Sequence, residues 1–155
     1  MTARTTGLAL IAITGMATLP QPGLAASEVA NARVEILPAL GINQSTQVDF
    51  GQLHNANGSC SMDASGELSG PTEMACTGTR TPGVFTISGA SGATIIVSTT
   101  QGSADGVTFE PIVAGGPSHL LDNGQATVTV AGSLVLESAS EGIKNITYTF
   151  TANYQ

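Results

Sequence analysis

Short runs rich in β-branched and aromatic residues recur along this chain, and glycine-containing dipeptides separate them. The runs read TQVDFGQL, GVFTISG, ATIIVSTT, GVTFEPIV, ATVTVAGSLVLES and ITYTFTANY. The turn signals between them are Asn57-Gly58, Ser91-Gly92, Asp105-Gly106, Gly115-Gly116-Pro117 and Asn123-Gly124. Such dipeptides supply the positive φ angles of tight turns, and helical periodicity is nearly absent beyond the leader. The spacing therefore predicts an all-β, antiparallel sandwich or barrel.

Residues 1–25 have the composition of a secretory signal peptide. Arg4 precedes an apolar run that starts at Gly7, and small residues surround a cleavage site near Ala25. The run is short and is interrupted by glycine and proline, so a retained membrane anchor is the weaker alternative. Cleavage leaves roughly 130 residues, enough for one core. We therefore expect one exported domain over 38–155, with no membrane insertion after cleavage.

Acidic residues dominate the charge of the chain. There are 4 Lys and Arg residues against 11 Asp and Glu, and one of the four, Arg4, lies in the leader. This balance argues against nucleic acid or an anionic lipid surface as a partner. Charged residues make up only 10% of the chain, so small polar residues must form most of the surface. Such a surface is a weak indication of a structural role.

Cys60 and Cys76 are the only two cysteines. In an exported chain the default is a disulfide, which in the chain-entropy model stabilises a loop of this size by about 3 kcal/mol. A metal pair is the alternative, but neither His54 nor His119 completes a zinc-type ligand spacing, so we expect no metal. The irregular stretch 57–82 is expected to be a long loop or weak hairpin that the disulfide restrains.

No motif typical of catalysis stands out. No Gly-x-Ser-x-Gly elbow surrounds a serine, and His54 and His119 lie beside turn signals, where solvent-facing loop histidines are expected. Asp49 is expected to be buried and to accept hydrogen bonds from backbone amides rather than to act as an acid or base. The sequence favours a protein that is not an enzyme and needs no cofactor.

The segment after the leader, residues 26–37, alternates apolar and polar residues. The apolar positions are Ala30, Ala32, Val34 and Ile36. Period-two alternation indicates a strand with one buried face. Two interpretations remain open here: this strand belongs to the domain's own sheet, or it is an arm that fills a groove of another subunit.

The last residues of the chain alternate in the same way. The positions that share one face are Ile146, Tyr148, Phe150, Ala152 and Tyr154. The opposite face carries threonine and asparagine, so the sequence predicts a half-buried strand over 145–154. This strand is either an interior strand of a complete sandwich or an edge that accepts a partner's strand.

Two segments resemble a family of bacterial exported domains. TQVDFGQL resembles its L-x-F-G segment, and VAGSLVLESASEGIKNITYTFTANYQ resembles its closing segment. That family is similar in pattern to spore coat protein U and to chaperone–usher fimbrial subunits. The tail also resembles the closing motif of chaperone–usher pilins, with an aromatic residue, Tyr154, at the penultimate position and a glycine, Gly142, fourteenth from the end.

The resemblance implies an immunoglobulin-like sandwich that lacks one strand. It implies that Ala30, Ala32, Val34 and Ile36 form a donor strand. The implied acceptor edge comprises Gly142, Ile146, Tyr148, Phe150, Ala152 and Tyr154. The implied partners are copies of this chain or related subunits, a periplasmic chaperone and an outer-membrane usher.

The sequence thus favours an exported fimbrial or adhesive subunit that passes through the periplasm to the cell surface. The alternative is a self-contained secreted binding module, for example for carbohydrate. Aromatic residues make up only 4% of the chain, which argues against the sugar-binding alternative because sugar sites favour aromatic platforms.

Overall fold

The computed structural model describes residues 27–155, so the predicted signal peptide lies outside the described residues. The chain divides into two units, with the boundary between Val34 and Glu35. In the first unit, residues 27–34 form no strand. The second unit, residues 35–155, is called the body below. It contains every described strand, and no helix in the described part of the chain is long and apolar enough to cross a membrane.

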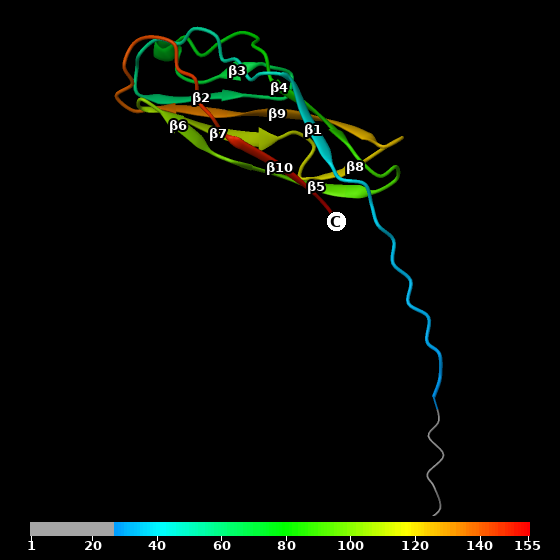
Figure 1. Cartoon of the computed structure of the whole chain (residues 1–155). Helices are drawn as coiled ribbons and strands as arrows, with labels where there is room; N and C mark the ends of the chain where they lie inside the picture. The colour runs from blue at the N-terminus through cyan, green and yellow to red at the C-terminus, as the bar shows by residue number, and fades with distance from the viewer. Residues whose placement is uncertain (1–26) are drawn as a thin grey trace, which may run out of the picture. The chain divides into compact units, whose positions relative to one another are not determined.

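The body is built almost entirely of antiparallel strands, which confirms the predicted all-β, sandwich-like class. One short 3-10 helix, η1 (Thr72–Met74), lies among them. The strands are β1 (Gly41–Thr46), β2 (Gly58–Met62), β3 (Leu68–Ser69), β4 (Gly83–Ser88), β5 (Thr94–Thr100), β6 (Gly102–Ala104), β7 (Val107–Val113), β8 (Ser118–Leu120), β9 (Gln125–Leu136) and β10 (Thr149–Tyr154). Figure 1 shows their arrangement in the body.

The larger sheet is organised around β9, its longest strand, with 12 residues. One edge of β9 pairs with β7, and the other pairs first with β4 and then with β2. Strand β1 lies outside β4, β3 outside β2, and β6 outside β7. The smaller sheet has the order β10-β5-β8. The chain changes sheet between the end of β5 and the start of β6.

The core lies between the two sheets, in two clusters of buried side chains. Phe150 of β10 packs against both clusters. Its ring stacks on that of Phe85 of β4, with centroids 4.0 Å apart and an interplanar angle of 3°. One aromatic contact therefore connects the last strand of the smaller sheet to the centre of the larger one.

The predicted alternation of the last strand is confirmed over Thr149–Tyr154. Phe150, Ala152 and Tyr154 are half-buried, and the residues between them are exposed. The paired strand is shorter than the predicted span, because it begins only at Thr149. Upstream, Gly102 of β6 lies against the backbone carbonyl of Thr147, so the chain there crosses the point where β5 gives way to β6.

The run TQVDFGQL is not the strand that its pattern predicts. Only Thr46 belongs to a strand, β1, and Asp49 makes an isolated bridge to Thr81. The Asp49 carboxylate accepts a hydrogen bond from the amide of Gly51 at 2.7 Å, and Gly51 has a φ of 69°. These interactions turn the backbone. Asp49 bonds a backbone amide as expected, but it is exposed rather than buried.

The predicted disulfide joins Cys60 of β2 to Cys76, with the two Cα atoms 5.7 Å apart. Both residues are buried in the core. The surrounding stretch contains the short β2–β3 hairpin and η1, so the expectation of a weak hairpin is met. The disulfide fixes the loop after η1 to the central part of the larger sheet.

The body's first strand is β1, and residues 27–40 form no strand. The interpretation of residues 29–36 as the first strand of the domain's own sheet therefore does not describe this structure. The interpretation as a donated arm stays a prediction. Ile36, which belongs to the body unit, is 88% exposed.

Candidate functional site

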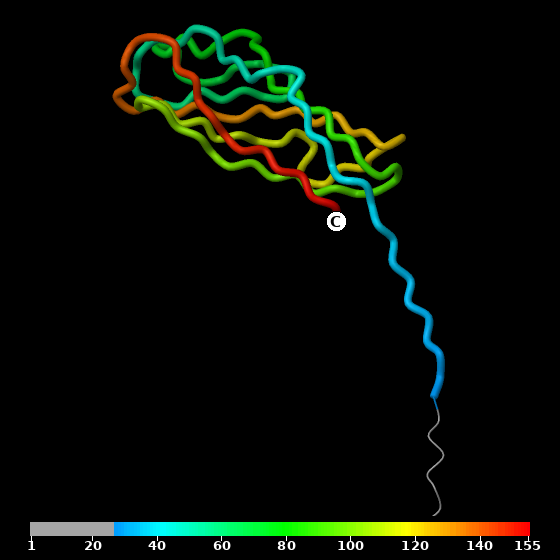
Figure 2. Tube along the Cα trace, viewed as in Figure 1, coloured from blue at the N-terminus to red at the C-terminus, as the bar shows by residue number. Residues whose placement is uncertain are grey.

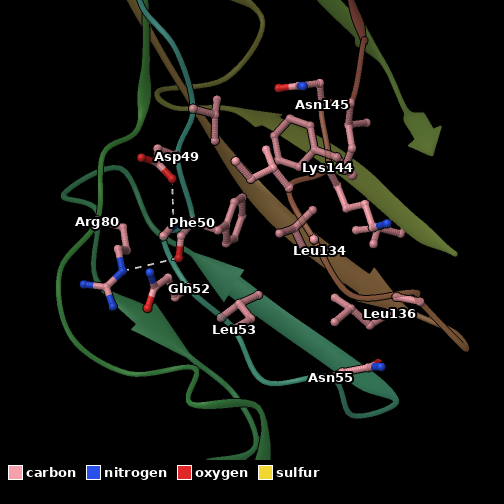
Figure 3. Close-up of a pocket in the computed structure, with 18 of the residues that line it drawn as sticks. Asp49, Phe50, Gln52, Leu53, Asn55, Arg80, Leu134, Leu136, Lys144 and Asn145 are labelled. Atoms are coloured by element: carbon pink, nitrogen blue, oxygen red, sulfur yellow. Dashed lines mark hydrogen bonds between the residues drawn. The ribbon is translucent and has the colours of Figure 1, made fainter. Parts of the chain in front are cut away.

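A large cavity of about 1530 Å³ opens on one side of the body. One wall is the segment 47–55, which follows β1. The other wall is the segment 139–148, which precedes β10. The floor is formed by Val107 and Phe109 of β7 and by Leu134 and Leu136 of β9. In Figure 3, Leu134 and Leu136 lie opposite Phe50 and Leu53 across this space.

The floor is apolar because it consists of inward-facing residues from two paired strands. Val107 pairs with Leu136 and Phe109 pairs with Leu134, so all four side chains lie on one face of the larger sheet. The Phe109 ring also meets Tyr148 edge to face, with centroids 5.1 Å apart. The floor therefore belongs to the hydrophobic core, and its four side chains are only 3–9% exposed.

A second, smaller hollow of about 220 Å³ adjoins the first, between Gln44 of β1 and the segment that precedes β10. It is lined by Gln44, Gln47, Ile146, Thr147 and Tyr148. Three of these residues, Gln47, Ile146 and Tyr148, also line the larger cavity. The two hollows together form one depression, which we call the groove.

A hydrogen-bonded contact links the end of β10 to the chain that precedes β1. The Tyr154 hydroxyl donates a hydrogen bond to the carbonyl oxygen of Pro38 at 2.9 Å and accepts one from the Ala90 amide at 2.7 Å. The chain that leads into β1 is thus bonded to the end of β10. Figure 2 shows these two segments approaching each other at this end of the body and diverging toward the other. No residue of β10 lines either hollow, so this contact lies beyond the groove.

Both strands that border the groove are edge strands. Within residues 27–155, β1 pairs only with β4 and β10 pairs only with β5. Because no strand pairs with the outer side of β1 in the described residues, the side chain of Ile42 remains exposed. Its cross-strand partner Ile87 is fully buried, yet Ile42 itself is 44% exposed on the same face. One further strand beside β1 would cover Ile42.

Polar groups surround the larger cavity of the groove. Lys144 donates a hydrogen bond to the Ser140 hydroxyl at 2.6 Å and forms an ion pair with Asp105 at 3.6 Å. On the opposite wall, the Arg80 guanidinium donates to the Phe50 carbonyl oxygen at 3.3 Å. These contacts hold the two walls in place, and the apolar floor lies between them.

Tyr148, which lines both hollows of the groove, has a perturbed titration. Burial raises the pKa of its hydroxyl above the ordinary value of 10.0, because the charged phenolate is poorly solvated there. Its hydroxyl oxygen has no hydrogen-bond partner among the described residues. The ring therefore serves as an apolar surface of the groove, and its polar end is not satisfied within the body.

The structure brings together part of the predicted site. Ile146 and Tyr148 line the groove, whereas Phe150, Ala152 and Tyr154 lie on the inner face of β10. Gly142 is an exposed wall residue with a φ of 111° and is not part of a strand. The predicted donor positions Ala30, Ala32, Val34 and Ile36 are exposed and form no strand.

Sequence reasoning missed the floor of the groove and the wall at 47–55. The alternation of Val107 with Phe109 and of Leu134 with Leu136 predicts side chains that face the core. Nothing in that alternation tells which core residues lie beside a cavity, because this depends on the distance between the segments 47–55 and 139–148.

The two histidines lie on different parts of the body. His54 is exposed on the groove wall, as expected. His119 was expected in a solvent-facing loop, but it lies half-buried on β8, with no hydrogen-bond partner in the described structure for its Nε2 atom. No cluster of three or more histidine, cysteine or acidic side chains suited to a metal occurs in residues 27–155.

Fold and site together define a disulfide-bonded antiparallel β-sandwich with a groove whose floor is apolar and whose walls adjoin two edge strands. Comparison of the chain with protein-family models, with curated proteins and with solved structures finds no match.

Proposed function

We propose that this protein is an exported structural subunit, of the fimbrial or adhesive kind, that assembles by strand addition. The observation that supports the proposal is the groove with an apolar floor between segments 47–55 and 139–148, which adjoin the edge strands β1 and β10. Its occupant is an extended segment from another copy of this chain or from a related subunit. The function is binding and assembly, without catalysis.

Strand addition matches both kinds of surface that the groove presents. The free backbone edges of β1 and β10 can form hydrogen bonds with an inserted strand, and alternate side chains of that strand would cover the floor. Each valine or isoleucine that becomes fully buried contributes about 1.5–3 kcal/mol. Uncovered edges of this kind otherwise favour uncontrolled association, so a specific occupant also protects the subunit.

The segment 26–37 is the proposed donor because its pattern fits such an occupant. Its apolar positions alternate, and Val34 and Ile36 are 82% and 88% exposed. The signal-peptide pattern supports export to the periplasm and the cell surface. The resemblance to fimbrial subunits suggests a periplasmic chaperone that protects the groove and an outer-membrane usher that assembles the subunits.

The test is size-exclusion chromatography with light scattering on the exported protein, with and without residues 26–37. We expect arm-dependent dimers, ladders or fibres. Val34→Asp should abolish them, because it places a charge on the apolar floor, while the body keeps its folded circular-dichroism spectrum. The matched control is Arg33→Asp, which puts the same residue on the opposite face of the arm and should preserve assembly.

A stable monomer whose behaviour does not depend on the arm would contradict the proposal. In that case the groove would be a site for a different ligand, and the self-contained binding module would be the better description.

A further inference from the structure

We propose that residues 138–148 form a strap that swings away from the rest of the body as a unit and uncovers the apolar floor of the groove. The latch that keeps this strap shut is the contact between Lys144 of the strap and Asp105, which lies in the turn between β6 and β7. The inference goes beyond the proposed function, because it concerns access to the floor and holds for any occupant of the groove.

The strap has no backbone hydrogen bonds to hold it. The last backbone bond before it runs from the amide of Glu137 to the carbonyl oxygen of Gly106, at 2.8 Å, and strand pairing resumes only at Thr149. Within residues 27–155, no amide or carbonyl group of residues 138–148 bonds another backbone group. Figure 2 shows this stretch, in orange and red, looping from the end of β9 back to β10. Its release therefore breaks no strand pairing, and segments of this kind open at the lowest cost in a folded protein.

The strap covers the floor with three side chains. Ala139 is 8% exposed, and Ile146 and Tyr148 pack against the same core cluster that contains the floor. The Tyr148 ring meets two aromatic rings of the larger sheet, those of Phe85 and Phe109, edge to face. The floor side chains are buried while these contacts last, so moving the strap away would expose them to water.

The latch is a contact of a single lysine. The Lys144 Nζ atom lies 3.6 Å from the Asp105 carboxylate, and it donates a hydrogen bond to the Ser140 hydroxyl of the strap itself at 2.6 Å. The lysine side chain is only 15% exposed, whereas that of Asp105 is 73% exposed. An ion pair with one partner in water is weak and is screened by salt. Such a contact can keep the strap closed and still be broken without unfolding the body.

Backbone geometry shows where the strap can turn. The Ser138 amide donates a hydrogen bond to the Asn57 Oδ1 atom at 2.8 Å, which fixes the first residue of the strap. Gly142 has a φ of 111°, which residues with a side chain rarely adopt, and a Cβ atom there would meet no other atom within 4 Å. The neighbouring Ile143 is 91% exposed. The bend at Gly142 thus lies free of the core, and the second part of the strap can move on it while both ends stay in place.

Thiol labelling of the exported full chain, in its monomeric fraction, measures the opening. Val107→Cys places a thiol on the floor, and Val128→Cys places one in the second core cluster, against which no strap residue packs. Both valines are buried, and Cys60 and Cys76 are joined to each other, so each variant carries a single reactive thiol. Without denaturant, a maleimide reagent should label the Val107→Cys chain about tenfold faster or more, because local opening is more frequent than global unfolding.

Asp105→Asn tests the latch, because asparagine has the same shape and tolerates the left-handed φ of 48° at this position. Added to the Val107→Cys chain, it should speed labelling about two- to five-fold, the effect of losing one exposed ion pair. Sodium chloride should speed labelling of the chain that keeps Asp105 and should have no such effect after Asp105→Asn. The matched control is Glu110→Gln, which removes one negative charge from an exposed position of β7 and should leave the rate unchanged.

Equal labelling of the Val107→Cys and Val128→Cys chains would overturn the strap, since both thiols would then be reached only by unfolding of the whole body. Faster labelling on the floor that ignores Asp105→Asn and salt would overturn the latch. Leu134→Cys repeats the test at a second floor position if Val107→Cys does not keep the circular-dichroism spectrum of the parent chain. None of these results depends on assembly, so the proposed function stands or falls separately, in light scattering.

Discussion

At the scale of single residues, the two tyrosines of the chain occupy opposite situations. The Tyr154 hydroxyl makes two hydrogen bonds, to the carbonyl oxygen of Pro38 and from the amide of Ala90, and these join the end of β10 to the chain before β1. The Tyr148 hydroxyl is buried in the described structure without a partner. Hydrogen bonds within a folded protein stabilise it by about 0.5–1.5 kcal/mol each, whereas a buried hydroxyl without a partner is a cost. The same chemical group should therefore have opposite effects at these two positions.

This contrast gives a paired prediction. Tyr154→Phe should lower the free energy of unfolding by about 1–3 kcal/mol, because two hydrogen bonds are lost. Tyr148→Phe should leave it unchanged or raise it slightly. Urea unfolding followed by circular dichroism measures both variants against the parent chain. Equal losses in the two variants would show that the Tyr154 hydrogen bonds do not hold the end of β10 in solution.

At the scale of elements, the final strand is anchored at one end by pairing and at the other by close packing. From Thr149 onward it pairs with β5. Just upstream, its backbone passes directly over Gly102, the first residue of β6. A Cβ atom at position 102 would collide with the Thr147 carbonyl group. The absence of a side chain there lets the last segment reach the inner edge of the groove.

Gly102→Ala tests this close approach. The added methyl group must displace the backbone at Thr147, so we expect a loss of about 1–3 kcal/mol in unfolding free energy, as for overpacked cores. We also expect weaker assembly, because Ile146 and Tyr148 would move with it. Ser103→Ala, on the exposed neighbouring position of β6, is the control and should change neither quantity. A fully stable Gly102→Ala variant would contradict the packing described for this crossing.

The strands also show which parts of the fold can be predicted from the alternation of apolar and polar residues. Strands β4, β5, β7 and β9 follow their alternating runs closely, because both faces of each strand have defined neighbours. Strand β1 was missed because an edge strand with one open side needs little apolar alternation, and its sequence GINQST shows almost none. The neighbouring run TQVDFGQL was misread because side-chain bonds from Asp49 and Arg80 turn a backbone whose residues favour strands.

For the candidate site, the sequence identified the last strand but not the space beside it. The apolar character of Ile146 and Tyr148 is a local property and can be read from their alternation. The width of the groove is not a property of one segment. It depends on the distance between the segment that follows β1 and the segment that precedes β10. Residues as far apart as Phe50 and Leu134 become neighbours of one cavity only through the fold of the body.

At the scale of the whole molecule, the body should behave as a receptor for its own missing strand. A synthetic peptide of residues 27–37, added to the exported protein lacking residues 26–37, should raise the melting temperature of the body. The shift should increase with peptide concentration, because a ligand that binds only the folded state stabilises it by mass action. The same peptide with Val34→Asp should give no shift. Equal shifts with both peptides would show that binding does not use the apolar floor.

The hydrogen bond between Tyr154 and Pro38 has a mechanical consequence for an assembly of this kind. In the proposed assembly, the donated arm would lie along β1 and β10, and each subunit's own arm would leave the body near the end of β10, where Tyr154 holds Pro38. Tension along such a filament acts parallel to β1 and β10. It loads the inter-strand hydrogen bonds in shear, all together, rather than opening them one after another from an end. A filament of these subunits would resist stretching more strongly than peeling.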